Sequence, residues 1–307
     1  MRVVFFGTPE FAVPSLEALL GEGFDVIAAV TQPDKPQGRS RSTAVAPPVK
    51  LAAEAEGVPV LQPARPTDAE FVARVRALAP DVGVVVAYGH ILKPDLLALP
   101  RRGMINLHPS LLPELRGAAP VEWAILNGLE QTGVTIMLMD AGLDSGPILH
   151  QIPHHIDPEV TGGELSEHLS EMGAQALVEA LALLESDGVK PRPQDHARAS
   201  YAPKLTREMA RISWSEPAER VARVIRGLDP KPGAWTELDG REVKLFGARV
   251  VEDRGAPGEA RTTADELRIT AGRGAVVVAE VQPAGRARMA AAAWVRGRGV
   301  QAGQRFT

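Results

Sequence analysis

Short apolar runs alternate with amphipathic segments along the first half of the chain. Continuous apolar runs at 3–6, 26–30 and 82–87, and the run at 104–108 with its two polar residues, have the length of buried strands. The segments between them carry apolar residues at helical spacing, at 11–20, 49–55 and 71–78. Buried strands separated by helices are typical of a parallel sheet that is covered on both faces. We therefore predict an α/β fold with a Rossmann-like, doubly wound, mostly parallel sheet.

The pattern changes after a long amphipathic segment at 163–184. A polar stretch rich in proline follows, as in a linker. Beyond it, one helical segment at 216–228 precedes alternating strand-like runs, two of which flank Asp239-Gly240, a strong hairpin signal. We predict a smaller β-rich, OB-like barrel here. The expected domains are 1–187, a linker at 188–205, and 206–307.

Composition narrows the class of protein. The 307 residues suit two domains, and the absence of cysteine excludes disulfides, thiolate zinc sites and a cysteine nucleophile. No apolar run reaches the roughly 18 residues of a membrane span, and the N-terminus lacks the pattern of a signal peptide. We therefore expect a cytoplasmic protein, and a monomer, because no unexplained apolar stretch demands a partner.

Charge is distributed unevenly. Residues 1–205 hold 16 Lys and Arg against 25 Asp and Glu, a net charge of -9, whereas residues 206–307 hold 18 against 13, a net charge of +5. A basic second half favours a polyanionic partner such as a nucleic acid. An ordinary arginine-rich surface is the alternative, and charge alone does not separate the two.

The first strand-to-helix turn argues against a dinucleotide cofactor. Its residues, Gly7 to Ala12, lack the three-glycine fingerprint, and Pro9 and Glu10 stand where a pyrophosphate needs free amides. Thr8 is instead expected to cap the following helix, with Pro9 at its first position.

Asn106 and His108 form the first candidate site. On a strand, residues two apart project to the same face, so the amide and the imidazole are expected to lie side by side. Together they could donate hydrogen bonds to an oxyanion. The alternative is that both satisfy buried backbone groups.

Asp140 and Asp144 follow a second strand-like run at 132–140. Both lie in a glycine-containing turn at that strand's carboxyl end, where this architecture collects ligands. A carboxylate here could orient His108 and stabilise its charged form. The alternative is that both aspartates form the turn by bonding their own backbone.

These segments resemble the methionyl-tRNA formyltransferases, a family of folate-dependent formyltransferases. The matching segments are 6–12, 31–34, 87–89, 105–113, 116–120 and 132–146, and in the second domain 212–214, 226–230, 232–235 and 282–285. The resemblance therefore covers nearly the whole chain. It implies transfer of the formyl group of 10-formyltetrahydrofolate to the α-amine of initiator methionyl-tRNA, with Asn106, His108 and Asp144 as catalytic residues and without a metal.

The resemblance also implies binding residues. For the folate they are Ser110, Leu111, Leu112 and Pro113, with Ala87, Tyr88, Gly89 and Asp140 at the border of the pterin pocket. We expected an exposed loop backbone and apolar leucines at 110–113. For the tRNA they are Arg39 and Arg41 in the polar segment 32–48, together with Thr8 and Pro9. That segment shows no strand or helix pattern, and without the resemblance it would be a flexible surface loop.

Two other functions stay open at this point. A relative could use the same folate chemistry on a small amine, such as glycinamide ribonucleotide or an amino sugar. Alternatively, a non-catalytic RNA-binding protein could retain the first domain as a relic. The second domain is basic, with Arg286 and Arg288 where the family commonly has lysines. This favours a polyanionic acceptor over a small amine. The intact set of three catalytic residues argues against the non-catalytic alternative.

Overall fold

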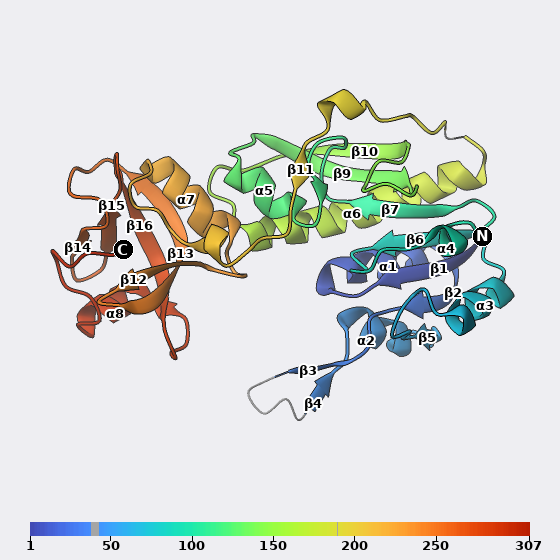
Figure 1. The fold of residues 1–307 in the computed structure, drawn as a ribbon, viewed down its shortest axis with the longest axis horizontal. Helices are drawn as coiled ribbons and strands as arrows, with labels where there is room; N and C mark the ends of the chain where they lie inside the picture. Colours follow the sequence, from blue (N-terminus) through green and yellow to red (C-terminus); the bar gives the residue numbers. More distant parts are fainter. Residues whose placement is uncertain (38–42, 189) are drawn as a thin grey trace. The chain divides into compact units, whose positions relative to one another are not determined.

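The computed structural model describes residues 1–37, 43–188 and 190–307 (Figure 1). The chain forms two compact units. The first comprises 1–117, 132–154 and 166–201, and the second comprises 118–131, 155–165 and 202–307. The second unit thus takes two segments from the first half of the chain. The domain boundaries drawn from the sequence at 187 and 206 stay a prediction.

A mostly parallel sheet forms the centre of the first unit, as predicted. Its strands are β1 (Arg2–Gly7), β2 (Asp25–Val30), β5 (Val60–Leu61), β6 (Val82–Val86), β7 (Met104–His108), β9 (Gln131–Leu138) and β10 (Ile148–His155). They lie in the order β10-β9-β7-β6-β1-β2-β5 (Figure 1). The pairs β1–β2, β1–β6, β2–β5 and β6–β7 are parallel, whereas β7 and β9 are antiparallel.

Helices bury the apolar strands of this sheet. They are α1 (Val13–Gly21), α2 (Pro48–Ala55), α3 (Ala69–Leu78), α4 (Pro94–Leu97) and α6 (Gly162–Glu185), with the 3-10 turn η1 (Glu10–Ala12) before α1. Gly173 of α6 lies so close to β7 that a Cβ there would come within 2.6 Å of the Leu107 side chain. Since neighbouring strand residues face opposite ways, the side chains of Asn106 and His108 point away from α6.

Two short strand pairs complete the first unit. β3 (Lys35–Gln37) and β4 (Thr43–Val45) pair antiparallel, so the prediction that 32–48 lacks strands is wrong at both flanks of the segment. β8 (Arg116–Gly117) pairs with β11 (Tyr201–Ala202). The strand β11 and the 3-10 turn η2 (His196–Arg198) lie in the stretch predicted as a linker.

The second unit is built on an antiparallel sheet, as predicted. Its elements are α5 (Pro120–Leu126), η3 (Glu208–Ala210), α7 (Ala218–Gly227), β12 (Ala234–Leu238), β13 (Arg241–Val251), β14 (Ala260–Thr262), β15 (Leu267–Thr270), β16 (Ala275–Pro283), β17 (Met289–Ala290) and α8 (Ala291–Arg296). The strands follow the order β12-β13-β16-β15-β14, with β17 beside β16. Asp239 and Gly240 both have positive φ, 50° and 71°, as a two-residue hairpin turn requires.

The C-terminal residues close this sheet. Thr307 exchanges backbone hydrogen bonds of 3.0 and 2.9 Å with Glu237 of β12. Phe306 N donates to Gly258 O, at 2.8 Å, and Ala260 of β14 donates to Gln304 O, also at 2.8 Å. One short segment therefore pairs with both ends of the strand order, and Phe306 is buried in the core that this closure encloses.

Candidate active site

Asn106 and His108 lie on one face of β7, as their spacing predicted. His108 is 4% exposed, while Asn106 is half-buried. Both stand at the carboxyl end of a strand that is parallel to β6, the edge at which this fold binds ligands. Within the part of the chain that the structure describes, no side chain or backbone group hydrogen-bonds the Asn106 amide, so its donors remain for a substrate.

Two contacts orient the His108 ring. Nε2 lies 2.9 Å from the carbonyl oxygen of Leu115, and Nδ1 lies 3.8 Å from Oδ2 of Asp144. A carbonyl only accepts hydrogen bonds, so Nε2 must carry a proton and donate it. In the neutral ring, Nδ1 is therefore the nitrogen without a proton. Its separation from the carboxylate exceeds a hydrogen bond and suits an ion pair when the ring is protonated.

Asp144 reaches His108 by a route that the sequence did not indicate. Because β9 runs antiparallel to β7, its carboxyl end lies at the edge opposite to that of β7, with Leu138 beside Ile105. The residues from 105 to 108 span about 10 Å of strand. The loop at 139–147 must fold back over that distance. The prediction that Asp144 lies near His108 because it follows a strand's carboxyl end was therefore wrong in its reason, since the carboxyl end of β9 is at the other edge of the sheet.

The conformation of Asp144 is held by the segment after the His108 strand. Asp144 has a φ of 46°, in the left-handed region that a residue with a side chain adopts at a cost of about 1–2 kcal/mol. Its Oδ2 accepts a 2.8 Å hydrogen bond from Gly117 N. The side chain is 17% exposed, so the carboxylate is partly shielded from water beside the imidazole.

Asp140 follows the alternative interpretation, in which the aspartate forms the turn. Its Oδ1 accepts from Gly142 N at 2.9 Å and from the Ser145 hydroxyl at 2.8 Å. Both contacts are local, and Asp140 itself is exposed. Of the two aspartates in this loop, the structure brings only Asp144 to His108.

The loop at 110–113 is packed rather than open. Ser110 and Leu112 are 1% and 3% exposed, and Leu111 and Pro113 are half-buried. Leu112 packs against Met137 and Ile148. The expectation of an exposed loop backbone was therefore wrong, because the loop's polar groups bond within the protein.

One hydroxyl holds this loop to the sheet. Thr135 Oγ1 donates to Ser110 O at 2.6 Å, and it accepts from Leu112 N at 3.1 Å and from Gln151 Nε2 at 3.0 Å. One donor and two acceptor positions are all that a hydroxyl offers, so Thr135 is fully used. Sequence reasoning missed this residue, because a threonine within an apolar strand carries no distinguishing signal.

Thr8 and the segment 87–89 meet at the ends of β1 and β6. Tyr88 O accepts from Thr8 Oγ1 and from Gln32 Nε2, both at 3.0 Å. Thr8 therefore does not cap the helix: the turn starts at Glu10, and Pro9 is its exposed flanking residue. Ala87 and Gly89 are exposed, both with positive φ.

The Tyr88 side chain lies inside the unit. It is 1% exposed and packs edge to face against Phe6, with 5.5 Å between ring centroids. Burial raises the pKa of the Tyr88 hydroxyl to about 12, so the group stays neutral. Within the segment 87–89, Ala87 and Gly89 are therefore the residues exposed at this edge of the sheet.

Arg39 and Arg41 lie outside the described residues. The base of their segment is anchored nearby: Asp34 accepts from Gln62 at 2.8 Å and from Lys50 at 2.9 Å. These two hydrogen bonds lower the pKa of the Asp34 carboxyl. The pair of strands β3 and β4 therefore starts from a fixed point beside Gln32.

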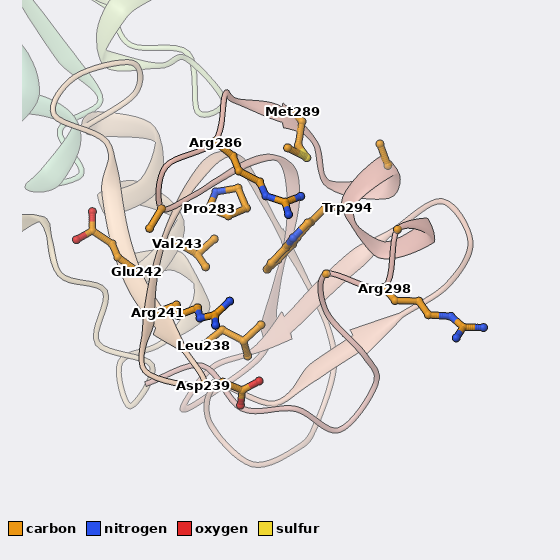
Figure 2. A pocket seen from close by; sticks show the side chains of 14 residues that line it. Leu238, Asp239, Arg241, Glu242, Val243, Pro283, Arg286, Met289, Trp294 and Arg298 are labelled. Carbon is orange, nitrogen blue, oxygen red and sulfur yellow. The ribbon is translucent and has the colours of Figure 1, made fainter. Parts of the chain in front are cut away.

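The second unit contains a cavity of about 620 Å³ between the β12–β13 turn, the end of β16 and α8 (Figure 2). Arg241, Arg286 and Trp294 are directed into it, whereas Glu242 and Arg298 point away. Neither Arg241 nor Arg286 pairs with a carboxylate within the described ranges. Arg288, which the sequence grouped with Arg286, is instead bound to Asp229 at 2.7 Å and to Glu280.

The described residues contain no group of three or more His, Asp or Glu side chains that could hold a metal ion. Nor do they contain a helix that is long and apolar enough to cross a membrane.

A buried imidazole facing a carboxylate, beside an open side-chain amide on an α/β sheet, is an arrangement that can stabilise an oxyanion and move a proton. The sequence model of formyl transferases matches residues 1–181, and that of the formyl transferase C-terminal domain matches 204–299. The chain belongs to the formyl transferase family, which confirms the resemblance seen in its motifs.

The relatives extend over the whole chain. A methionyl-tRNA formyltransferase of Roseiflexus sp. (strain RS-1) is 48% identical, covering 100% of this chain and 95% of its own. One of Magnetococcus marinus is 47% identical, covering 99% and 98%.

Solved structures share the fold. The N-formyltransferase of Helicobacter canadensis, in complex with folinic acid and dTDP-3-aminofucose, has a TM-score of 0.71 at 17% identity over 92% of this chain and 99% of its own. HypX of Aquifex aeolicus, in complex with tetrahydrofolic acid, has a TM-score of 0.68 at 20% identity over 96% of this chain. This chain spans about half of HypX, 47%.

We predict that Thr135→Val destabilises the protein by about 1–3 kcal/mol, because it leaves Ser110 O and Leu112 N buried without their partner. Thr132→Val is the matched control. Thr132 lies on the same strand, and its buried hydroxyl has no hydrogen-bond partner among the described residues. Urea unfolding of both variants measures the difference, and equal effects would contradict the role of Thr135.

Proposed function

We propose that the protein transfers the formyl group of 10-formyltetrahydrofolate to the α-amine of methionine on initiator methionyl-tRNA. The product, formylmethionyl-tRNA, serves translation initiation, which places the activity in the cytoplasm. The observation that carries the proposal is the geometry at His108: Nε2 is committed to Leu115 O while Nδ1 faces Asp144, next to the open amide of Asn106. We keep the monomer as our prediction of the oligomeric state.

The reaction forms one C–N bond and breaks another. The neutral methionine amine attacks the formyl carbon, and the carbonyl oxygen becomes an oxyanion. Collapse of this tetrahedral intermediate breaks the bond from the formyl carbon to N10 of the folate, and N10 takes up the proton that the amine loses. The chain must therefore stabilise an oxyanion and move one proton.

Asn106 and His108 supply the donors. The amide of Asn106 has no competing partner among the described residues, and the protonated His108 offers Nδ1–H while Nε2–H remains on the Leu115 carbonyl. Asp144 stabilises this imidazolium across 3.8 Å. It is also the base nearest to Nδ1, so it takes part in moving the amine proton to N10.

The folate would bind at the carboxyl edge of β6 and β7. The exposed residues Ala87 and Gly89 follow β6 at this edge, and the half-buried Leu111 and Pro113 follow β7, which carries the half-buried Asn106. HypX, which shares the fold, was solved with tetrahydrofolic acid. Because Ser110 and Leu112 are buried, we assign the contact within this loop to Leu111 and Pro113.

We assign the tRNA to Arg39, Arg41, Thr8 and Pro9 in the first unit and to the cavity arginines in the second. The cavity holds a tryptophan and two arginines that pair with no carboxylate in the part of the chain that the structure describes, which suits a phosphodiester with an adjacent flat group. Arg288 is excluded from this set, because Asp229 and Glu280 neutralise it.

Transfer to a small amine is the second candidate. The N-formyltransferase solved with dTDP-3-aminofucose is only 17% identical, whereas the relatives at 47–48%, matched over 95% and 98% of their own length, are methionyl-tRNA formyltransferases. The unpaired arginines of the second unit also favour a large polyanion. A non-catalytic role is disfavoured by the assembled contact between His108 and Asp144.

We expect the wild-type chain to formylate charged initiator tRNA with 10-formyltetrahydrofolate in a single-turnover assay, and His108→Ala to lose at least about 10²-fold in rate through loss of an oxyanion donor. Binding of tRNA should be unchanged. His155→Ala, at an exposed histidine, is the control. No product from the wild-type chain beside an active standard enzyme would refute the proposal.

Arg39→Ala should lower kcat/KM for tRNA while the KM for the folate stays the same, because the arginine serves only the tRNA. Steady-state kinetics with each substrate varied in turn measures this. An unchanged kcat/KM for tRNA would remove Arg39 from the interface.

The double variant Arg241→Gln, Arg286→Gln should weaken tRNA binding and lower the salt dependence of log Kd by about two, one for each lost phosphate contact. Arg273→Gln, Arg296→Gln is the control with the same change in charge, since both arginines pair with exposed carboxylates. Filter binding over a salt series compares them. Equal losses in the two double variants would mean that the cavity has no specific role.

A further inference from the structure

Gln194 occupies the predicted linker, yet it is 5% exposed and fully hydrogen-bonded. Its Oε1 accepts from Nε and Nη2 of Arg116, at 3.1 and 2.6 Å. Its Nε2 donates to Asp144 O at 2.9 Å and to Gly146 O at 2.7 Å. A guanidinium only donates and a carbonyl only accepts, so the orientation of this amide follows from its partners.

The loop that carries Asp144 needs such support. Residues 141–143 are exposed, and Asp144 itself has a left-handed φ. The turn before it is held internally by Asp140. Of the described side chains outside the loop, Gln194 is the one that hydrogen-bonds the backbone of Asp144.

Arg116 ties Gln194 to the other half of the catalytic pair. It is 4% exposed and directly follows Leu115, whose carbonyl binds His108 Nε2. Ser200 anchors the same segment, with its hydroxyl accepting from Leu115 N at 2.9 Å and its carbonyl accepting from Arg116 N at 2.9 Å. The contacts therefore close a ring from His108 through Leu115, Arg116 and Gln194 to Asp144.

We propose that Gln194 is a positioning residue that sets the separation of Asp144 from His108, with Arg116 orienting its amide. This role rests on the proposed function, in which those two side chains carry the chemistry. Gln194 is buried and its amide is satisfied within the protein, so it leaves no polar group for a substrate. Its removal should therefore change the rate of the chemical step and leave substrate binding unaltered.

Two variants separate the two ends of the amide. Gln194→Glu keeps an acceptor for Arg116 but presents a second oxygen to the carbonyls of Asp144 and Gly146, and Gln194→Met removes both interactions. We expect each variant to lower kcat by about tenfold or more, because the rate of the chemical step falls steeply when catalytic groups are displaced. The KM for both substrates should stay unchanged. Wild-type kcat in either folded variant would overturn the proposal.

Ser170→Ala controls for the loss of a buried hydrogen bond as such. The Ser170 hydroxyl is 4% exposed and donates to Phe11 O at 2.7 Å, in the same unit. We expect this variant to lose stability in a thermal melt while its kcat is unchanged. A loss of kcat equal to that of Gln194→Met would mean that destabilisation, and not positioning, lowers the rate.

A double-mutant cycle with Asp144→Asn tests the route of the effect. If Gln194 acts through Asp144, Gln194→Met should add little further loss in the Asp144→Asn background. A full multiplicative loss there would overturn the assignment.

A second readout is independent of activity. The ¹⁵N chemical shifts of the His108 ring at one pH should change in Gln194→Met and stay as in wild type in Ser170→Ala. If the wild-type chain proves inactive on tRNA, the proposed function fails, and these shifts still decide whether Gln194 positions the pair. Unchanged shifts in Gln194→Met would overturn the inference.

Discussion

The hydrogen bond from His108 Nε2 to the Leu115 carbonyl is the contact on which the proposed chemistry of this site depends. It assigns the ring's permanent proton to Nε2 and leaves Nδ1, facing Asp144, as the nitrogen that can act on a substrate. Leu115 has a φ of 57°, a costly conformation that persists because Ser200 holds the neighbouring backbone. The orientation of the His108 ring therefore depends on how firmly the segment after β7 is anchored.

A single antiparallel pairing explains why that anchoring is elaborate. With β9 reversed beside β7, the loop that carries Asp144 begins at the wrong edge of the sheet and has to return across it. A returning loop has few neighbours of its own. Its carboxylate is bound by Gly117 N, and its carbonyls are bound by Gln194, both from segments distant in sequence. The proposed catalytic pair, His108 and Asp144, is thus held in place by contacts from other parts of the chain.

Charge in the second unit shows a related distinction between residue type and availability. The net charge of +5 over residues 206–307 indicated a polyanionic partner but did not separate one arginine from another. Arg288 is neutralised by Asp229 and Glu280, whereas Arg241 and Arg286 are directed into a cavity and pair with no carboxylate among the described residues. Arg286 and Arg288 are only two positions apart in the sequence, yet only Arg286 has its charge available for a partner.

The sequence by itself determined the mostly parallel sheet, the hairpin at Asp239 and the shared face of Asn106 and His108, because each depends on local periodicity or turn chemistry. It also carried enough motif to place the chain in its family. Tertiary structure alone decided how the loop brings Asp144 to His108, that the 110–113 loop is buried, and that Gln194 hydrogen-bonds the Asp144 backbone. Those outcomes depend on strand direction and on hydrogen bonds between residues about 25 to 80 positions apart, which no local pattern encodes.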